Sequence, residues 1–469
     1  MSWVAVVADS HDRRRFYLWL GAIAIGAVVL RLVYVLAIKH GGPLLADEPY
    51  YHVQSDRIAD GIGFKTGVHG APAATHPPLA TIVLALASRV ASGDSVLEQR
   101  LALVVLGVCT VVVLGLLARD LAGPRAGLVT AALAACTPML WQYDGVILSE
   151  PLAGLLIACT LWAGYRYLRE PRILWAALLG LACGLAMLTR GELSLLVPFV
   201  LLPVLLIGKP ATIGQRVSRV AIAGAAALLV VGPWVGYNLS RFEKPVYLSV
   251  TVGGAICGAN NAEAYAGPKI GLWVPEACPL PTERQVPPGS DQSALTSYWS
   301  RVGFDYLKGH ADRLPLVVVA RLGRVMGVYA PAQTNDEAVR EGIPEKVAWA
   351  AYGAFFVFAA VGVWGAIVLR RRRVPLYPLL GAVLVVAVAT ASFYGLFRYR
   401  FAADIALVVL AGIGVDAWWS AITAGRSTTP EDDDDVKSSE ASPPSGSVLE
   451  TLEPEQGARG QGPARRDSA

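Results

Sequence analysis

The 469-residue sequence has little charge: Asp, Glu, Lys and Arg make up 16% of it, whereas hydrophobic residues make up 54%. Soluble globular domains average about 25% charged residues, so this composition argues against a soluble protein. The net charge is only +4, and no basic patch with interleaved aromatic side chains supports nucleic-acid binding. No small-residue cleavage site follows the first apolar segment, so we expect a retained anchor and not a removed signal peptide.

Long apolar runs recur along most of the chain. A run of about 17 to 25 apolar residues can cross a hydrocarbon core as a helix. The sequence therefore predicts an all-α polytopic membrane protein, a bundle of about ten transmembrane helices. We expect these helices at residues 16–38, 97–118, 124–141, 147–166, 173–190, 192–208, 217–236, 346–369, 374–394 and 401–420.

Basic residues predict the orientation of this bundle. With ten crossings, the clusters from Arg13–Arg15 to Arg370–Arg373 fall on one face, which the positive-inside rule makes cytoplasmic. Residues 1–15 would be a cytoplasmic N-terminus and residues 16–426 a domain in the plasma (inner) membrane. Residues 427–469, rich in Ser, Pro and acidic side chains, would be a disordered cytoplasmic tail.

Two long segments, 39–96 and 237–345, would then lie on the extracytoplasmic face. Residues 313–330 in the second segment are apolar but carry three arginines, which favours a helix lying along the membrane surface over an eleventh crossing. Cys257 and Cys278 also lie there, in a compartment that permits disulfides. We predict a disulfide between them, with two free thiols as the alternative because spacing does not show the geometry.

The stretch "ADEPYYHVQSDRIADG" (46–61) concentrates titratable side chains just beyond the first apolar helix. Pro49 suits a first helical turn and Gly61 a helix end, which predicts a helix over 49–60. Asp47 would lie at the mouth of the turn. Carboxylates are costly at a lipid boundary unless they are used, so Asp47 and Glu48 are predicted to be catalytic. The alternative is that they are solvated capping acids.

Other polar residues recur at the same outer level. His76 precedes Pro77-Pro78 and an apolar stretch too short to span, which predicts a second surface helix within 74–90. Arg190 and Glu192 at an outer hairpin form either an ion pair or part of a site. Two arginines at the start of the last helix suit phosphate recognition, with snorkelling to lipid headgroups as the alternative. These residues are Arg398 and Arg400, and Asp144 and Glu150 lie at the turn between the third and fourth helices.

The "DE" pair followed by Tyr50 and Tyr51, the "HPPL" motif at 76–79, the acidic residue after the third helix and the late "RYR" together resemble one family. It is the polyprenyl-phosphate-sugar-dependent membrane glycosyltransferases of the GT-C fold, specifically the protein O-mannosyltransferase and aminoarabinose-transferase group. The resemblance covers about residues 16–420. It implies a GT-C-like bundle with extracytoplasmic juxtamembrane helices.

The resemblance also implies an inverting transfer of a sugar, mannose or a pentose, from a polyprenyl-phosphate donor in the membrane to a hydroxyl of a protein, glycan or lipid. Asp47 would be the general base beside Glu48, and no general acid would be needed because the leaving group is already an anion. Arg398, Arg400 and His76 would bind the donor phosphate, and Tyr50, Tyr51, His52, Asp144 and Glu150 would contact donor or acceptor.

One departure from the family bears on metal binding. Thr75 and His76 stand where aminoarabinose transferases have a Glu-Lys pair, which removes one carboxylate and one permanent cation. A divalent metal held by Asp47, Glu48, His52 and His76 or His69 stays open, although no fixed ligand spacing such as HExxH is present. The alternative functions are a transporter or flippase and a non-catalytic binder of lipid-linked sugars. A transporter usually concentrates polar residues near the midplane, whereas here they gather at outer helix ends.

Overall fold

The computed structural model describes residues 10–66, 70–90, 95–208 and 212–426. Contacts divide the chain into two units, Met1–Ala421 and Ile422–Ala469, and the helical bundle with its outer segments belongs to the first. The predicted tail, the first nine residues and His69 lie outside the described residues.

Each of the ten segments expected to cross the membrane is helical, which confirms the predicted fold class. α1 continues as a π-helical turn, and the sixth segment is a series of short helical pieces. The elements are α1 (Ser10–Val33), η1 (Tyr34–Lys39), α4 (Ser95–Ala122), α5 (Pro124–Cys136), α6 (Pro138–Trp141), η2 (Gln142–Gly145), α7 (Glu150–Arg169), α8 (Ile173–Met187), η3 (Gly191–Leu195), η4 (Val197–Leu201), α9 (Leu202–Ile207), α10 (Ile213–Leu239), α16 (Glu345–Arg371), α17 (Tyr377–Ser392), η8 (Phe397–Arg400) and α18 (Phe401–Arg426).

Five helices of the described chain are long and apolar enough to span a membrane by length and composition. They cover His11–Lys39, Ser95–Ala122, Ile213–Leu239, Glu345–Arg371 and Phe397–Thr423. α5, α8, α17 and the pieces between Gly191 and Ile207 are shorter apolar helices. The protein is therefore a multi-pass membrane protein, while the count of ten crossings stays a prediction.

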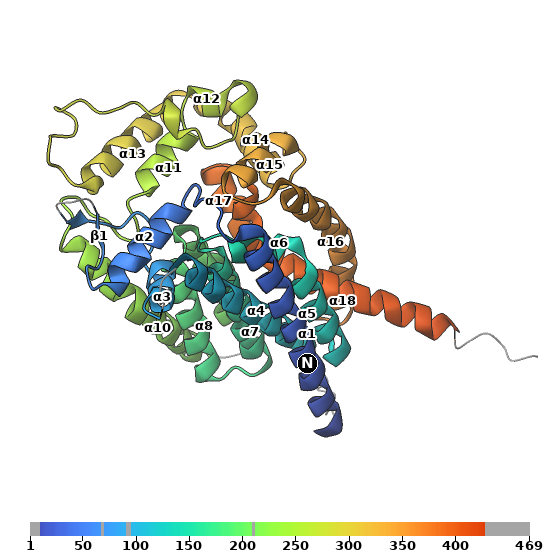
Figure 1. Ribbon diagram of the computed structural model, residues 1–469. Helices are drawn as coiled ribbons and strands as arrows, with labels where there is room; N and C mark the ends of the chain where they lie inside the picture. Colours follow the sequence, from blue (N-terminus) through green and yellow to red (C-terminus); the bar gives the residue numbers. More distant parts are fainter. Residues whose placement is uncertain (1–9, 67–69, 91–94, 209–211, 427–469) are drawn as a thin grey trace, which may run out of the picture. The chain divides into compact units, whose positions relative to one another are not determined.

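The two long segments predicted to be outer, 39–96 and 237–345, contain short helices and the small sheet. The first holds α2 (Glu48–Ala59), β1 (Lys65–Thr66), β2 (Ala71–Pro72) and α3 (Leu79–Ser88), and the two strands pair antiparallel. The second holds α11 (Val252–Ala259), α12 (Ala262–Tyr265), η5 (Gly267–Lys269), η6 (Pro275–Ala277), α13 (Gln292–Gly309), η7 (Ala311–Arg313), α14 (Leu314–Val325) and α15 (Pro331–Arg340). α2, α3 and α14 are helical where the sequence predicts three short helices, and their location along the membrane surface stays a prediction. Figure 1 shows α11 to α15 at the top, opposite the N-terminal end of α1.

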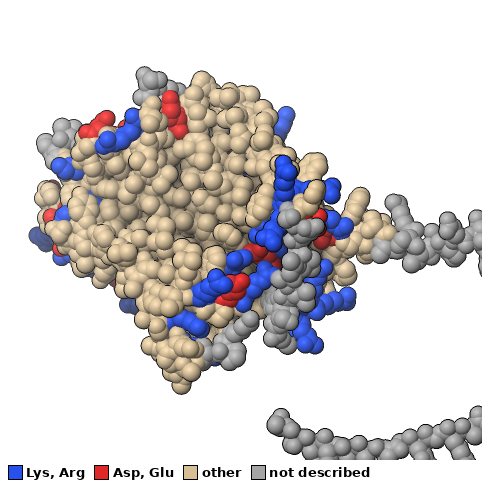
Figure 2. Space-filling model, turned by 90° about the horizontal axis from the view of Figure 1, so that it is seen from below, with Lys and Arg blue, Asp and Glu red and all other residues tan. Residues whose placement is uncertain are grey.

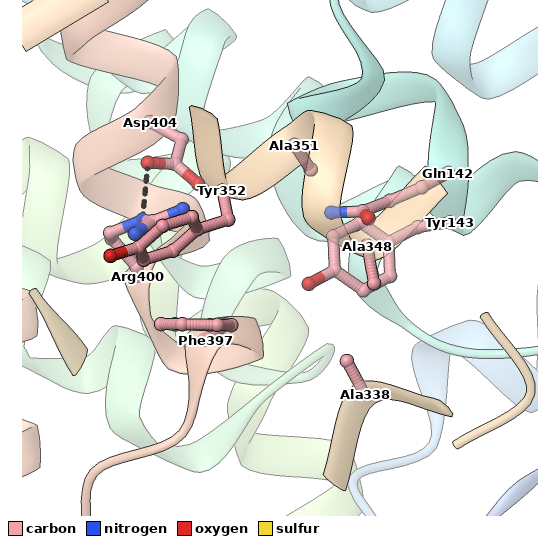
Figure 3. A pocket seen from close by; sticks show the side chains of 9 residues that line it. All are labelled: Gln142, Tyr143, Ala338, Ala348, Ala351, Tyr352, Phe397, Arg400 and Asp404. Atoms are coloured by element: carbon pink, nitrogen blue, oxygen red, sulfur yellow. Dashed lines mark hydrogen bonds and ion pairs between the residues drawn. The ribbon is translucent and has the colours of Figure 1, made fainter. Parts of the chain in front are cut away.

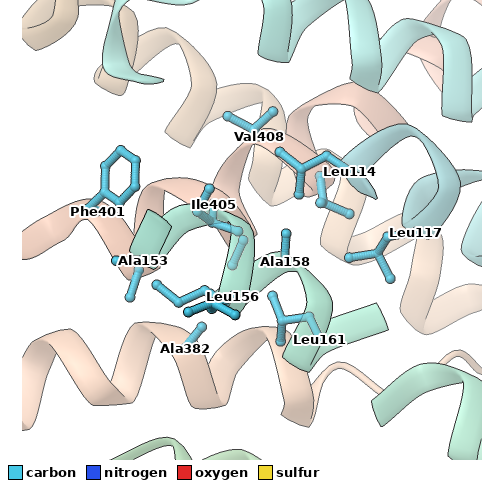
Figure 4. Close-up of a cluster of buried hydrophobic side chains, with 14 of the residues drawn as sticks. Leu114, Leu117, Ala153, Leu156, Ala158, Leu161, Ala382, Phe401, Ile405 and Val408 are labelled. Atoms are coloured by element: carbon cyan, nitrogen blue, oxygen red, sulfur yellow. The ribbon is translucent and has the colours of Figure 1, made fainter. Parts of the chain in front are cut away.

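The core forms around α7, most of which is buried. Figure 4 shows Ala153, Leu156 and Leu161 of α7 among side chains of α4, α17 and α18. Small residues let helix backbones approach closely, which is how helices associate where lipid removes most of the hydrophobic drive. This packing holds the N-terminal end of α7 next to the start of α18.

Charged side chains are unevenly spread over the surface. Figure 2 shows the face that lies below in Figure 1, where Lys and Arg outnumber Asp and Glu and form a band beside a broad area without charge. Basic residues occupy the last turns of α7 and α16. This distribution is what the positive-inside rule expects of a cytoplasmic face, and the orientation itself stays a prediction.

The crossing of α8 and α10 depends on Gly180, because a Cβ there would overlap the backbone carbonyl of Ala223. Gly180→Ala should therefore lower the free energy of unfolding by about 1 to 3 kcal/mol through overpacking. Gly224→Ala on α10 is the control, because no heavy atom lies within 4 Å of its Cβ position. That variant should be neutral or slightly stabilising, since Ala is the better helix former. Thermal unfolding in detergent measures both, and equal melting temperatures would refute this account of the crossing.

Candidate active site

Arg398, in η8 at the start of the last membrane helix, joins three carboxylates. Its Nη1 donates to Asp47 Oδ2 at 3.0 Å and to Glu341 Oε1 at 2.8 Å, and its Nε donates to Glu150 Oε1 at 2.9 Å. The arginine side chain is only 9% exposed. We call these four residues the Arg398 cluster. They bring together chain segments that are far apart in the sequence.

Local sequence explains why two of the acids lie at helix starts. Asp47 is the N-cap of α2 and Glu150 is the first residue of α7, and each helix has a proline in its first turn. Proline fits there because the first amides have no intrahelical acceptor, and the same amides favour a nearby negative charge. The side chain of Asp47 makes no capping hydrogen bond. Its carboxylate is thus available to Arg398.

Asp47 is the most accessible acid of the Arg398 cluster. Its side chain is 36% exposed, against 13% for Glu341 and 0% for Glu150. Burial raises the pKa of Asp47, but the His76 ring at 3.8 Å and the charge of Arg398 outweigh this and hold it below its ordinary value. Asp47 is therefore an ionised carboxylate at neutral pH that a substrate can reach.

His76 is held between two tyrosines. The Tyr51 ring stacks on it with 5.1 Å between centroids, and the Tyr50 ring meets it edge-on at 5.0 Å. The backbone N–H of His76 donates to the hydroxyl of Tyr50 at 3.4 Å. These contacts fix the imidazole beside Asp47. The structure thus brings together six of the predicted site residues: Asp47, Tyr50, Tyr51, His76, Glu150 and Arg398.

Glu150 connects the Arg398 cluster to a second cation. Its Oε1 also accepts a hydrogen bond from Arg190 Nη1, and Arg190 Nε donates to Glu192. The other carboxylate oxygen, Oε2, is buried and has no hydrogen-bond partner among the described residues. Of the readings left open by the sequence, the ion pair of Arg190 with Glu192 is present, and it adjoins the site.

Glu341 was not found by sequence reasoning. It follows α15 in the short loop before α16, and burial raises its pKa to about 7, although the charge of Arg398 opposes this shift. The only local signal is an acidic residue shortly before a predicted outer helix start, as at Asp47 and Glu150.

Glu48 occupies a different environment from its neighbour. It is fully buried, and its carboxylate accepts hydrogen bonds from the backbone amides of Leu45 at 3.0 Å and Ile147 at 2.9 Å. Arg100 Nη2 lies 3.6 Å away. Its contacts tie the start of α2 to the segment before α7. This geometry favours a positioning role, and direct catalysis by Glu48 stays a prediction.

Two further predicted residues have other partners. The His52 ring lies 3.1 Å from Gln99 Oε1 and 3.6 Å from Asp56 Oδ2. Asp144 accepts a hydrogen bond of 2.6 Å from Arg31 Nε, and both side chains are buried. The structure gives neither of them a contact with the Arg398 cluster within the described residues.

Arg400 also turns away from the Arg398 cluster. Its Nε donates to Asp404 at 2.9 Å, and its guanidinium lies 3.7 Å from the centre of the Phe355 ring. Figure 3 shows Arg400 and Asp404 beside Phe397, with Tyr143 on the other side of a cavity of about 10 Å³. A cavity of that size holds roughly one water molecule. Phosphate binding by Arg400 stays a prediction that this buried pairing does not favour.

The metal candidates are not gathered into one coordination site. Within the ranges that the structure describes, no group of three or more His, Cys, Asp or Glu side chains is arranged to hold an ion. Glu48 and His52 face different partners, and His69 is not among the described residues. We therefore derive no step through a metal. In the second outer segment, Cys257 and Cys278 form a disulfide with their Cα atoms 5.9 Å apart.

The Arg398–Glu150 contact should be energetically coupled, because removing either partner takes one counterion from a buried charge. Arg398→Gln should lower the free energy of unfolding by about 3 kcal/mol. The double variant Arg398→Gln/Glu150→Gln should lose less than the sum of the single losses, with a coupling of about 0.5 to 3 kcal/mol. Denaturant titration in detergent measures all three proteins.

Arg172→Gln is the matched control, because Arg172 and its partner Glu170 form a largely exposed ion pair. Exposed pairs contribute little, so this variant should unfold like the wild type. Strict additivity of the two single changes at Arg398 and Glu150 would refute the coupling.

Comparisons with known proteins agree with this architecture. Residues 75–237 match the family described as dolichyl-phosphate-mannose-protein mannosyltransferase. Undecaprenyl phosphate-α-4-amino-4-deoxy-L-arabinose arabinosyl transferases from two strains of Pseudomonas aeruginosa are 34% identical over 152 residues, which are 30% of this chain and 27% of theirs. The match thus spans about a quarter of the length of these relatives.

Solved structures extend the likeness to most of the chain. An archaeal oligosaccharyltransferase from Archaeoglobus fulgidus, in complex with an inhibitory peptide and a dolichol-phosphate, has a TM-score of 0.50 at 14% identity over 89% of this chain and 52% of that one. The same enzyme tethered to an acceptor peptide has a TM-score of 0.53 at 15% identity over 87% and 50%. The resemblance expected from the sequence is confirmed: this chain is a polytopic membrane protein with the GT-C fold, similar in residues 75–237 to the protein mannosyltransferases.

Proposed function

We propose that the protein is a membrane glycosyltransferase that moves a sugar, mannose or a pentose, from a polyprenyl-phosphate donor to a hydroxyl acceptor. The observation that carries the proposal is the accessible carboxylate of Asp47, held between Arg398 and the His76 ring. A base within reach of a hydroxyl, next to cations that suit a phosphate, is what such a transfer requires. The arabinosyl and mannosyl transfers named for its relatives use sugars of these classes.

The reaction follows from this arrangement. Asp47 takes the proton of the acceptor hydroxyl. At the same time the hydroxyl oxygen of the acceptor attacks the anomeric carbon from the side opposite the phosphate. The bond between that carbon and the phosphate oxygen breaks, its electron pair leaves with the polyprenyl phosphate, and the configuration inverts. The departing phosphate needs no proton because it is already an anion. Arg398 stabilises the charge that gathers on it.

The neighbouring residues support this step. The two tyrosines that enclose His76 keep its imidazole beside Asp47, where it would meet the donor phosphate. Glu48 fixes the start of α2 so that Asp47 keeps its direction. Mispositioning a base by about 1 Å can cost two orders of magnitude in rate. Glu48 thus acts through Asp47, and we assign it a positioning role.

The proposal sets the reaction on the extracytoplasmic face of the plasma (inner) membrane. Asp47 follows the first membrane helix and Arg398 precedes the last, and the positive-inside rule directs both of these helix ends outward. A lipid-linked donor carries its sugar at headgroup depth, which is the depth that the proposed orientation gives these side chains. The acceptor is a hydroxyl of a protein, a glycan or a lipid.

Asp47→Asn should lower sugar transfer by about 10² to 10⁴-fold, the usual contribution of a general base. Purified protein in nanodiscs receives polyprenyl-phosphate mannose or, separately, polyprenyl-phosphate arabinose, with membrane extract as the acceptor. Consumption of the lipid donor is the readout. Asp60→Asn, the same change at the exposed far end of α2, should leave the rate unchanged.

Full activity of the Asp47→Asn protein would refute the assignment of the base. If the wild-type protein consumes neither donor, donor-induced thermal stabilisation separates two outcomes. Stabilisation would mean that the protein binds or moves lipid-linked sugars without transferring them. No stabilisation would contradict recognition of these two donors.

A further inference from the structure

Two carboxylates share one nitrogen of Arg398. Glu341 Oε1 and Asp47 Oδ2 lie 2.8 and 3.0 Å from the same Nη1, which has two N–H groups to offer. Glu150 occupies Nε. One positive charge thus faces three carboxylates before any substrate is bound. A phosphodiester that approaches this guanidinium adds a fourth anion, which competes with the three carboxylates for one positive charge.

Glu341 is the carboxylate that can yield most easily. Glu150 is fully buried and is also bound by Arg190, and Asp47 is also next to His76. In the described part of the chain, Arg398 is the one cation that forms an ion pair with Glu341. Glu341 also lies in a loop and not within a helix.

The backbone around Glu341 is anchored, so the exchange needs only a side-chain movement. Lys39 Nζ donates to the carbonyl of the next residue, Gly342, at 2.6 Å, and Ile343 is buried. Gly342 has φ of +92°, in the left-handed region that favours glycine. A rotation of the Glu341 side chain would free one of the two N–H groups of Nη1 while the loop stays in place.

We propose that Glu341 holds the place of the donor phosphate on Arg398 and gives it up when a polyprenyl phosphodiester binds. This inference rests on the proposed function and adds a residue that sets the affinity for the lipid donor. Glu341 gives way most readily in its neutral form, which accepts only a weak hydrogen bond from the guanidinium. In its ionised form it competes with the phosphate for Arg398.

Competition of this kind predicts a pH dependence. Glu341 has a pKa of about 7, so about one tenth of it is neutral one pH unit above that value. The apparent affinity for the donor scales with the fraction of protein in which Glu341 is neutral. The affinity of the wild type should therefore fall about tenfold between low pH, where Glu341 is neutral, and one pH unit above its pKa. The charged groups around Glu341 are Arg398, Asp47 and Glu150, with Lys39 and Glu48 at the adjacent Gly342. Because several charged groups surround Glu341, a variant is needed to isolate its contribution.

The test uses polyprenyl methyl phosphate, a diester whose single charge does not change over this pH range. Its dissociation constant is measured for the full-length protein in nanodiscs about one pH unit below and above pH 7. At the higher pH, Glu341→Gln should bind the probe about tenfold more tightly than the wild type. At the lower pH the two should converge. Glu337→Gln on α15, which removes a nearby carboxylate paired with Arg340, should behave like the wild type.

Each outcome decides the matter. If Glu341→Gln binds the probe as the wild type does or more weakly at the higher pH, the inference is wrong. Binding of the probe by the wild type would still support the proposed donor site. A flat wild-type pH profile would overturn it without any variant, and Glu341→Ala gives a second comparison if the Gln variant does not fold. If none of the proteins binds the probe, the proposed function fails together with the inference.

Discussion

The buried guanidinium of Arg398 is the constraint on which the site depends. A buried cation is stable only when carboxylates and hydrogen bonds surround it, and here these carboxylates lie 351, 248 and 57 residues away along the chain. The packing of α7 against α18 must therefore be correct before the site exists. Glu48 makes a parallel connection from α2 to the segment before α7. The two adjacent acids thus have different roles, since the Asp47 side chain is accessible and the Glu48 side chain is buried in the protein.

The same ion pair links donor binding to base strength in the proposed reaction. Before the donor arrives, Arg398 and His76 hold the Asp47 carboxylate ionised and make it a weak base. A phosphate that takes over part of the Arg398 charge leaves the carboxylate less stabilised and so more basic. Asp47 would then become an effective base only beside a bound donor. Such an order would limit unproductive reactions in the absence of the donor.

Much of the helical architecture could be predicted from local patterns. Pro49 and Gly61 predict α2, and apolar length predicts the membrane helices. The direction in which each side chain points was harder to predict from the sequence. Arg398 and Arg400 are two residues apart in a 3-10 turn, and only Arg398 reaches Asp47, whereas Arg400 pairs with Asp404 at a spacing of four. The contact between Arg400 and Asp404 could be predicted from the sequence, because residues four apart lie on the same face of a helix. Glu341 has a partner 57 residues away, which only tertiary packing determines.

The most direct test of the account is an electron cryomicroscopy map of the protein in nanodiscs with a bound polyprenyl-phosphate lipid. The account predicts phosphate density within hydrogen-bonding distance of the Arg398 guanidinium, with Asp47 still beside it and the Glu341 side chain turned away. Phosphate density elsewhere, for example beside Arg400 with the Arg398 cluster unchanged, would contradict the proposed donor site.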